Sequence, residues 1–598
     1  MTSLFIHPSF GVSLRGVWFA LIAILALFAC LRCVSTARAD VASPPNVLLI
    51  LTDDQGWGDL AVHGNESIRT PTLDRLSQQS VRLNRFFVSP VCAPTRAALL
   101  TGRYPERGGV AGVTGRLEVM RSSEVTLAER FRAAGYATGC FGKWHNGAQM
   151  PLHPNGQGFD TFFGFCGGHF NFYDDPVLER NGVEEATKGY ITDLFTDEAI
   201  QFISRSKKQP YFCYVPFNAP HGPFQVDPNL FEHYRKTGLD PKTAAVYAMV
   251  QNIDDNVGRL LQAIDDRGDA DNTIVIFMTD NGPNGKRYNG GMRGIKGSVH
   301  EGGCRVPCFV RWPARLQPRD IEQITGHIDI TPTLQDWCGL TDTAADKPLD
   351  GQSLTQLLTT GQDAALNKRV ILTLRPQSTA PGKLSRAAAR TSDFRLVIEK
   401  SRTSLFDMRS DPEQRTDVSS AHPAIVKQLT QQIENYIDET KASVHVDRPV
   451  PIVNTRPVFI PAVDATLSGE CGFADEVPFA HSWVDRWQQA SDSIQWSCDV
   501  LDAGRYELIL HYVCAEANVP VVFSMAGQRG QQILPVVDHV AVRRPDLDPT
   551  ANRRMLRFGQ HRLGTVELTK AVHGLSLKRG TDGNAMMELF GITLRSVD

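Results

Sequence analysis

The sequence has no excess of charge of one sign and few of the cysteine patterns that signal structural metal sites. Its 598 residues include 62 lysines and arginines against 65 aspartates and glutamates, which gives a net charge of -3. Nucleic-acid binding usually depends on a basic excess, so the composition argues against that class of partner. Apart from Cys30 and Cys33 near the amino terminus, the ten cysteines are scattered without CxxC spacing. This excludes a zinc ribbon or a small disulfide scaffold as the organising element.

The amino-terminal apolar run is too short for a membrane-spanning helix. It covers residues 17–31, whereas a span needs about 20 apolar residues. Arg15 precedes it and small residues follow at 37–39, which is the order found in a secretory signal. We therefore expect 1–39 to be a cleaved signal peptide, and the mature protein to be exported to the periplasm or secreted. Two alternatives are an uncleaved signal anchor and a lipid anchor at Cys30.

The sequence contains no fixed-period repeat and no low-complexity tract, and its first half indicates an α/β domain. Continuous apolar runs at 46–52, 211–215 and 274–279 suit strands that are buried on both faces of a parallel sheet. Helical periodicity lies between them, at 72–79 and at 244–267, where we expect Asp254 and Asp255 on the polar side. Strands that alternate with helices predict one α/β domain over about 40–365.

Two smaller units follow this domain. Short strands at 396–399 and 404–406 and a closing helix at 423–440 predict a small α+β subdomain over 366–445. A proline-rich stretch at 446–465 has the composition of a linker. Short alternating segments between turns then predict an all-β sandwich over 466–598. Its tryptophans, Trp483, Trp487 and Trp496, fit a buried core better than a sugar-stacking face, although both interpretations are open.

Acidic and amide side chains follow two of the expected strands. Asp53 and Asp54 come directly after the first strand, and Asp280 and Asn281 come directly after another. Ligands in open α/β sheets bind beyond the carboxyl ends of strands. Four oxygen donors at two such ends suit calcium or magnesium better than zinc. Taken alone, each pair is better explained as a turn.

A cysteine lies at the start of another expected helix. In the run Cys92-Ala93-Pro94-Thr95-Arg96, the proline fits the first helical turn. Cys92 would then lie at a helix amino end, where free N–H groups and the helix dipole favour an anion. Arg96 adds a forked donor for oxyanions. Without its neighbours, this cysteine would be read as a buried structural residue.

With its neighbours, the segment resembles the signature of the type I sulfatases, a formylglycine-dependent, arylsulfatase-like family of the alkaline phosphatase superfamily. The C-x-P-x-R core is followed by LLTGRYP, and the common pattern has Ser where this chain has Thr95. Further family elements occur in the expected order over about 45–440. They are GKWH at 142–145, PH-x-P at 220–223, RG-x-K at 293–296, EGG-x-RVP at 301–307, and the elements around His327 and Leu405.

The resemblance implies an activity, a fold and a set of site residues. The fold would be a large mixed sheet between helices, followed by the small α+β subdomain. In that family the cysteine is oxidised by a maturating enzyme to Cα-formylglycine, whose hydrate attacks the sulfur of a sulfate ester. One calcium ion would be held by Asp53, Asp54, Cys92, Asp280 and Asn281. Lys143, Lys296 and Arg96 would stabilise sulfate oxygens, His221 with Lys296 would be the acid, and His145 the base.

The expected substrate is a sulfate ester, with a sulfated carbohydrate as the leading candidate.

Lys143 and His145 are two residues apart, so on an extended segment they would point the same way. His153, His169 and His300 lie near these motifs and are interpreted as structural or solvent-facing.

Two rival functions are a phosphonate or phosphate ester hydrolase of the same superfamily and an inactive glycan-binding protein. A two-zinc phosphatase would need a Ser or Thr nucleophile and more His and Asp ligands.

Overall fold

The computed structural model describes residues 1–4, 43–341, 347–376, 384–444, 448–475, 478, 480, 482–538, 546–548, 557–583 and 586–597. Contacts divide the chain into Met1–Pro44 and Pro45–Asp598, and the second unit is described below. Most of the predicted signal peptide lies outside the described residues. Within the described part, each helix is too short or too polar to cross a membrane.

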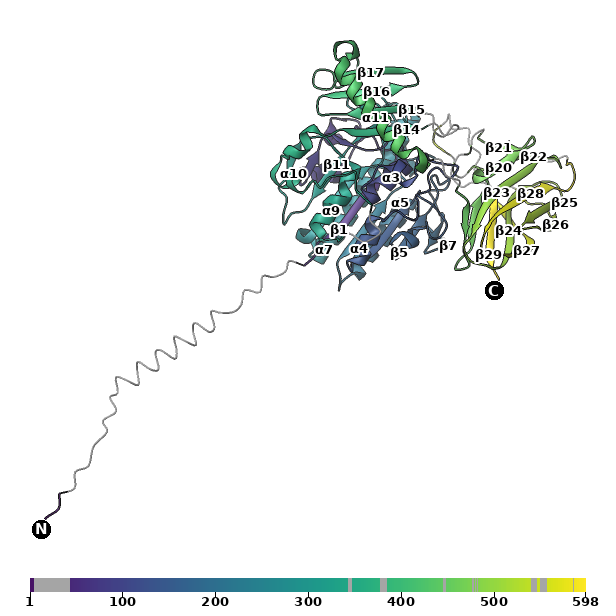
Figure 1. The fold of residues 1–598 in the computed structure, drawn as a ribbon, viewed down its shortest axis with the longest axis horizontal. Helices are drawn as coiled ribbons and strands as arrows, with labels where there is room; N and C mark the ends of the chain where they lie inside the picture. Colours follow the sequence, from purple (N-terminus) through teal and green to yellow (C-terminus); the bar gives the residue numbers. More distant parts are fainter. Residues whose placement is uncertain are drawn as a thin grey trace. The chain divides into compact units, whose positions relative to one another are not determined.

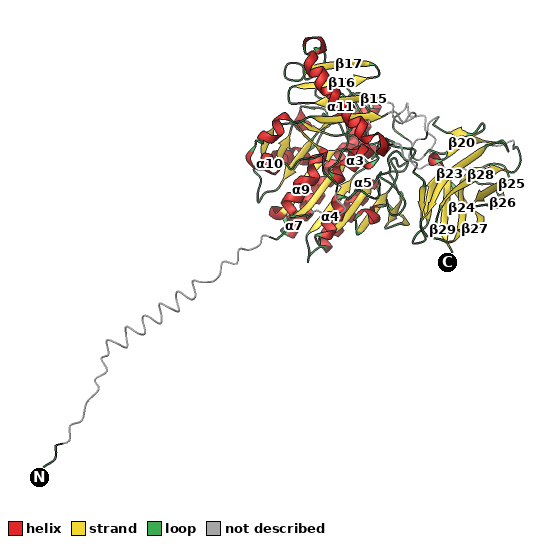
Figure 2. Ribbon diagram, in the orientation of Figure 1, coloured by secondary structure: helices red, strands yellow, loops and turns green. Residues whose placement is uncertain are grey.

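The first domain is a layered α/β structure around a mixed sheet, as the sequence predicts (Figures 1 and 2). Ten strands of the described residues lie in the order β12-β2-β11-β9-β1-β8-β4-β5-β6-β7. Their bounds are β1 Asn46–Thr52, β2 Val81–Leu83, β4 Ala137–Lys143, β5 Thr161–Phe165, β6 Val177–Arg180, β7 Val183–Ala186, β8 Tyr211–Pro216, β9 Thr273–Thr279, β11 Cys308–Arg311 and β12 Arg319–Ile321. The central strands β9, β1, β8 and β4 are mutually parallel.

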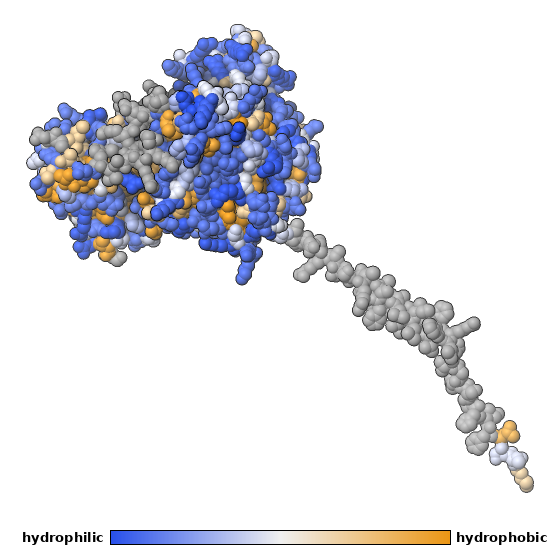
Figure 3. All heavy atoms as spheres, turned by 180° about the vertical axis from the view of Figure 1, so that it is seen from behind, coloured by the Kyte–Doolittle hydropathy of each residue, from blue (hydrophilic) through white to orange (hydrophobic). Residues whose placement is uncertain are grey.

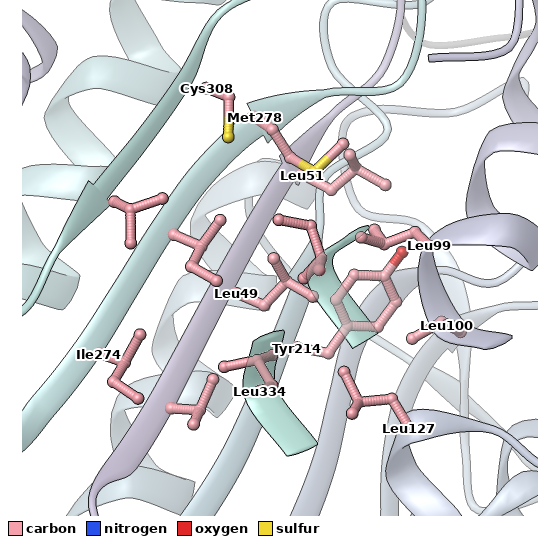
Figure 4. Close-up of a cluster of buried hydrophobic side chains, with 14 of the residues drawn as sticks. Leu49, Leu51, Leu99, Leu100, Leu127, Tyr214, Ile274, Met278, Cys308 and Leu334 are labelled. Atoms are coloured by element: carbon pink, nitrogen blue, oxygen red, sulfur yellow. The ribbon is translucent and has the colours of Figure 1, made fainter. Parts of the chain in front are cut away.

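Helices cover both faces of this sheet because its central strands are apolar on both sides. In β1, Leu49 and Leu51 face one core and Leu48 and Ile50 face the other. The first core is shown in Figure 4, where Leu99, Leu127 and Leu334 approach the sheet from three helices. These helices are α3 Cys92–Thr101, α4 Leu127–Ala133 and α9 Ile330–Cys338. Helix α10 Thr355–Thr360 packs on the same core. The second core is covered by α2 Pro71–Gln78, α5 Ile191–Arg205, α6 Pro228–Arg235 and α7 Pro241–Arg267.

The expectation for Asp254 in α7 is wrong. Its carboxylate is buried and accepts hydrogen bonds from the backbone N–H groups of Thr72 (3.1 Å) and Leu73 (2.7 Å) at the start of α2. Free N–H groups at a helix start need acceptors, and this carboxylate supplies them from another helix. The sequence predicts a solvent-facing position for Asp254, whereas its carboxylate ties α7 to the start of α2.

The small subdomain has a four-stranded sheet covered by one helix. Strands β14 Ile371–Pro376, β15 Leu384–Arg390, β16 Phe394–Glu399 and β17 Arg402–Asp407 form an antiparallel meander. The predicted closing helix is present as α11 Pro423–Val444, whose Leu429 and Ile433 pack into the core of this sheet. The subdomain therefore has the α+β composition that the sequence predicts.

The remaining strands form two sheets that enclose one core. The first has the order β18-β23-β28-β25-β26 with β20 beside β23, and the second β21-β22-β29-β24-β27 with β19 beside β29. Their bounds are β18 Val450–Ile452, β19 Val458–Pro461, β20 Thr466–Ser468, β21 Gly472–Phe473, β22 Val484–Trp487, β23 Ser493–Val500, β24 Gly504–Cys514, β25 Val519–Met525, β26 Gln528–Leu534, β27 Gly559–Leu568, β28 Val572–Arg579 and β29 Met587–Ser596. Trp483, Trp487 and Trp496 are all buried, so none of them forms an exposed stacking face.

The stretch expected as a linker differs from that expectation. Strands β18 and β19 both fall within 446–465 and pair with β23 and β29 of the sandwich. Their residues Val450, Ile452, Val458 and Ile460 are buried in the sandwich core. Prolines are tolerated in such strands at the margin of a sheet, which explains why a proline-rich stretch still forms them. On the face seen in Figure 3, the coloured residues are mostly hydrophilic, and apolar residues occur in small groups.

Candidate active site

Four neighbouring parallel strands deliver the expected site residues to one edge of the large sheet. Asp280 follows β9, Asp53 follows β1, His221 follows β8 within five residues, and Lys143 is the last residue of β4. Since these strands are parallel and adjacent, their carboxyl ends meet at this edge. Sites of this kind are typical of open α/β sheets, and the structure brings the sequence-derived residues together there.

Cys92 is the first residue of α3, which points its amino end at the same edge. Val91 before it is extended, and every residue of α3 is buried. Burial raises the pKa of the Cys92 thiol, and the nearby cations Lys143 and Lys296 only partly oppose this effect. Because the thiolate is the reactive form of cysteine, an unmodified Cys92 is a poor nucleophile in this setting.

Three carboxylates and three cations form a buried charge cluster around Cys92. The Arg96 guanidinium lies 2.9 Å from Asp280 Oδ2 and 3.4 Å from Asp53 Oδ2. Lys143 Nζ pairs with Asp53, and Lys296 Nζ lies 2.6 Å from Asp54 Oδ1. Burial alone would raise the carboxyl pKa values, but these cations outweigh it and lower the pKa of Asp53 and of Asp54.

Several oxygen atoms in this cluster suit a cation. Asp53 Oδ1, Asp54 Oδ2 and Asn281 Oδ1 are buried without a hydrogen-bond partner. Ligand atoms of Asp53, Cys92 and Asp280 lie within 4.8 Å of one another, as do those of Asp53, Asp54 and His221. Burial and the neighbouring Asp53 raise the pKa of Asp280 to about 7, a repulsion that a cation would relieve. The donor set fits a hard divalent ion, with oxygen atoms as its main ligands.

The two histidines of the site are buried and neutral. Burial and Lys143 hold the pKa of His145 well below its usual value, and burial and Lys296 lower the pKa of His221 to about 4. His145 Nε2 lies 2.9 Å from the Val113 carbonyl, which only accepts, so Nε2 carries the proton. His145 Nδ1 has no hydrogen-bond partner. His221 Nδ1 donates to the Gly222 carbonyl at 2.7 Å, and its Nε2 lies 3.6 Å from Asp54 Oδ2.

The expected geometry of Lys143 and His145 is wrong. We expected both on one extended segment, but β4 ends at Lys143 and His145 has a φ of 64°, in the left-handed region. The chain therefore turns between them. A non-glycine residue in this region costs energy and persists only where its surroundings fix it, here through the bond to Val113.

Supporting residues that sequence reasoning missed hold the acidic loop in place. Arg287 donates to the Asp54 carbonyl at 3.0 Å and to Asp59 Oδ1 at 2.7 Å. Its partner Asp59 is buried and accepts a further bond from the Gly56 N–H at 2.7 Å. The sequence signal for this pair is weak, because the two residues are separated by 228 positions.

A second support joins the Lys296 loop to the small subdomain. Glu301, from the EGG element, meets Arg395 at 3.0 Å and Arg390 at 3.3 Å, and both arginines come from that subdomain. These two arginines overcome the effect of burial and lower the pKa of Glu301. These contacts give Glu301 of the EGG element a structural role, because they anchor the loop that follows Lys296.

The three histidines set aside in the sequence have distinct surroundings. His153 Nε2 lies 2.5 Å from Glu179, and His300 Nε2 lies 3.3 Å from Glu399. His169 packs edge-on against His221, with ring centroids 5.2 Å apart. The first two are buried and pair with a glutamate, whereas His169 contacts a site residue.

Comparison with known proteins explains this arrangement. Residues 45–340 match the Sulfatase family, and residues 295–440 match the family "N-sulphoglucosamine sulphohydrolase, C-terminal". The N-acetylgalactosamine-6-sulfatase of Mus musculus is 33% identical over 361 residues, which cover 54% of this chain and 68% of that protein. This chain belongs to the sulfatase family. Sulfatase relatives of this kind also identify the protein as a sulfuric ester hydrolase.

Solved structures agree with the fold of this sulfatase. The crystal structure of Ps i-CgsB in complex with k-i-k-neocarrahexaose has a TM-score of 0.63 and 27% identity, and covers 67% of this chain and 94% of that chain. The phosphonate monoester hydrolase of Agrobacterium radiobacter has a TM-score of 0.52 at 21% identity, over 66% of this chain and 96% of that one. The second likeness concerns the fold alone. The two family matches end at residue 440, before the first strand of the β-sandwich.

Proposed function

We propose that this sulfatase removes sulfate from a glycan, with a Cα-formylglycine made from Cys92 and one bound calcium ion. The observation that carries the proposal is the buried cluster in which three carboxylates and three cations surround a cysteine at a helix start. Without a metal these charges balance. A divalent cation would leave the site positive, which suits a singly charged sulfate ester.

Modification of Cys92 is supported by its motif and its surroundings. The C-x-P-x-R core occupies the first turn of α3, and burial raises the thiol pKa, so the unmodified side chain is a poor nucleophile. As a hydrated aldehyde, formylglycine would offer a hydroxyl nucleophile at this position. The proposal requires a formylglycine-generating or sulfatase-maturating enzyme as a partner during biosynthesis.

Calcium is supported by the oxygen atoms that lack partners. Asp53, Asp54, Asp280 and Asn281 would hold it, together with the modified side chain of residue 92. When bound, it would supply positive charge to sulfate oxygens and to the nucleophile. Oxygen ligands from carboxylates and an amide favour calcium or magnesium over zinc.

The other site residues can bind sulfate and move protons. Lys143, Lys296 and Arg96 place positive charge around residue 92, where it can stabilise sulfate oxygens. His145 is the proposed base, since its unpartnered Nδ1 can accept a proton while Nε2–H remains bonded to Val113. His221 and Lys296 are the proposed acid pair for the leaving alcohol. Without substrate, Lys296 holds the proton of this pair, because Asp54 raises the pKa of Lys296 despite burial.

A sulfated carbohydrate is the proposed substrate class. One relative is named for N-acetylgalactosamine-6-sulfate chemistry, and one solved structure contains a neocarrahexaose oligosaccharide. We also propose that the protein is exported to the periplasm or secreted, from the signal-like order of residues 1–39. A soluble oligosaccharide or polysaccharide outside the cytoplasm would then be accessible to it.

The decisive experiment combines mass spectrometry with turnover. The protein is produced with a maturating enzyme, and the peptide containing residue 92 is weighed. Hydrolysis of 4-nitrophenyl sulfate and of a phenyl phosphonate ester is then compared for the native enzyme and for Cys92→Ala. We expect an aldehyde at residue 92, preferred hydrolysis of the sulfate, and no turnover by the variant. An unmodified thiol with full sulfatase activity would refute the proposed nucleophile, and preferred phosphonate hydrolysis would refute the proposed reaction.

A further inference from the structure

The β-sandwich contacts the loop that carries His221. The Phe224 N–H donates to Asp546 Oδ1 at 3.0 Å, and the Leu547 N–H donates to the Phe224 carbonyl at 2.9 Å. Both backbone groups of Phe224, three residues after His221, are thus bonded to a segment between strands β26 and β27 of the sandwich. Asp548 continues this contact, because its carboxylate lies 3.2 Å from Lys242 of the catalytic domain.

The catalytic domain also bonds to the loop that carries His221. The Tyr173 hydroxyl donates to the His221 carbonyl oxygen at 2.5 Å and also lies 3.2 Å from the Asn218 carbonyl oxygen, which can share the same hydrogen. The Tyr173 N–H is bonded to Gln225 at 2.9 Å. Besides burial, the carboxylates of Asp53, Asp54 and Asp546 all help to raise the pKa of Tyr173. The sandwich residue Asp546 therefore lies within electrostatic range of the same tyrosine as the proposed metal ligands.

A second contact of the β region reaches the loop that fixes His145. Arg116 lies three residues after Val113, whose carbonyl binds His145. The Arg116 side chain donates to the carbonyls of Arg448 and, at 3.2 Å, Pro449, and pairs with Asp464 at 3.5 Å. Arg448 in return donates to the Arg116 carbonyl at 2.6 Å. Arg116 has a φ of 63°, a left-handed conformation that such a dense set of contacts can maintain.

We infer that the carboxyl-terminal β-sandwich is a positioning element of the active site. Asp546 positions the His221 loop, and the Arg116–Asp464 contact positions the Val113 loop that orients His145. This inference rests on the roles proposed above for the two histidines. It differs from a binding module on a flexible tether, because one contact holds the backbone three residues after His221, and the other holds the backbone three residues after Val113, whose carbonyl binds His145. Misplacing a catalytic group by about 1 Å can cost about a hundredfold in rate, so such contacts matter for turnover.

The test compares variants of the full-length, matured enzyme. Asp546→Ala removes the acceptor for the Phe224 N–H, whereas Asp546→Asn retains an oxygen that can accept it. Arg562→Ala is the control, since Arg562 pairs with Glu507 on the sandwich itself. Turnover of 4-nitrophenyl sulfate gives kcat and KM. Hydrogen–deuterium exchange of peptides covering 217–226 and 110–120 reports on the two loops without requiring turnover.

We expect Asp546→Ala to lower kcat by about tenfold or more with less than about a threefold change in KM, since displacing one member of the proposed acid pair affects the chemical step. Exchange should rise in 217–226 but not in 110–120. Asp546→Asn should stay within about threefold of native kcat, and Arg562→Ala should match the native enzyme. For Arg116→Ala, the rise should occur in 110–120.

Three results would overturn the inference. They are native kcat and native exchange in Asp546→Ala, equal losses in the Ala and Asn variants, or a general rise in exchange across the sandwich. The last would show that the substitution unfolds the domain instead of releasing one loop. If the native enzyme hydrolyses no sulfate ester, the proposed function fails, but the exchange comparison still decides whether Asp546 holds the His221 loop.

Discussion

Arg96→Met is the substitution that tests the charge cluster most directly. The guanidinium is fully buried and makes bonds of 2.9 and 3.2 Å to Asp280 Oδ2 and one of 2.8 Å to the Lys143 carbonyl. It also lies 3.4 Å from Asp53. Methionine is unbranched, carries no charge and replaces the arginine side chain only as far as Nε, so it would keep the apolar stem while leaving Asp280 without its closest cation.

The expected cost follows from these contacts. Removing one partner of a buried ion pair destabilises a protein by about 3–5 kcal/mol, because the other charge stays buried and unpaired. Arg96→Lys keeps the charge but loses the planar guanidinium that donates to two groups at once. We therefore expect a smaller loss of about 1–2 kcal/mol in the free energy of unfolding. For kcat we expect a loss of about a hundredfold or more for Met, as for other groups that stabilise developing charge.

Urea unfolding of the metal-free protein measures the first effect, and 4-nitrophenyl sulfate turnover with calcium present measures the second. Arg402→Met is a matched control, since Arg402 is largely exposed and its contact with Asp417 is 3.5 Å. Exposed pairs contribute about 0–1 kcal/mol, so the control should unfold like the native protein. If Arg96→Met also unfolded and turned over like the native protein, Arg96 would have no part in holding the site together.

Three further predictions use other parts of the molecule. Chelation should abolish activity, and calcium should restore it better than zinc, as measured by turnover after metal addition. Lys143→Ala and His145→Ala should each lower kcat by about a hundredfold or more, and near-native turnover would remove that residue from the mechanism. Burial raises the pKa of Glu106 to about 7, so the folded state binds a proton that the unfolded state releases near 4.5. This contribution is full below pH 4.5 and is lost as pH rises to 7, so Glu106→Gln should raise the melting temperature at pH 8 but not at pH 4.5.

Much of the site could be predicted because it depends on local sequence. A buried strand followed by Asp53 and Asp54, and a second followed by Asp280 and Asn281, require only that the strands be parallel and adjacent. The start of α3 at Cys92 follows from Pro94 in its first turn. In both cases a short motif determines where the side chains begin, and the sheet topology brings the motifs together.

Features that depend on distant contacts could not be predicted in this way. Asp254 lies on a long helix with mixed composition, and nothing nearby in sequence shows that it binds the start of α2. The turn at His145 depends on Val113, a residue 32 positions away. The strands within 446–465 were missed because proline normally marks a loop, and only their pairing with β23 and β29 gives them a place in the sandwich.

These distant contacts have a common physical role at the active site. The charged side chains occupy a buried edge of the sheet, where each lone charge or unsatisfied oxygen is costly unless its neighbours are fixed in place. The acidic loop is fixed by Arg287 and Asp59, and the Lys296 loop by Glu301 with two arginines of the small subdomain. The histidine loops are fixed from the sandwich side as well. The sulfatase signature therefore points to the proposed reacting groups, while residues far from it in sequence fix the loops that carry those groups.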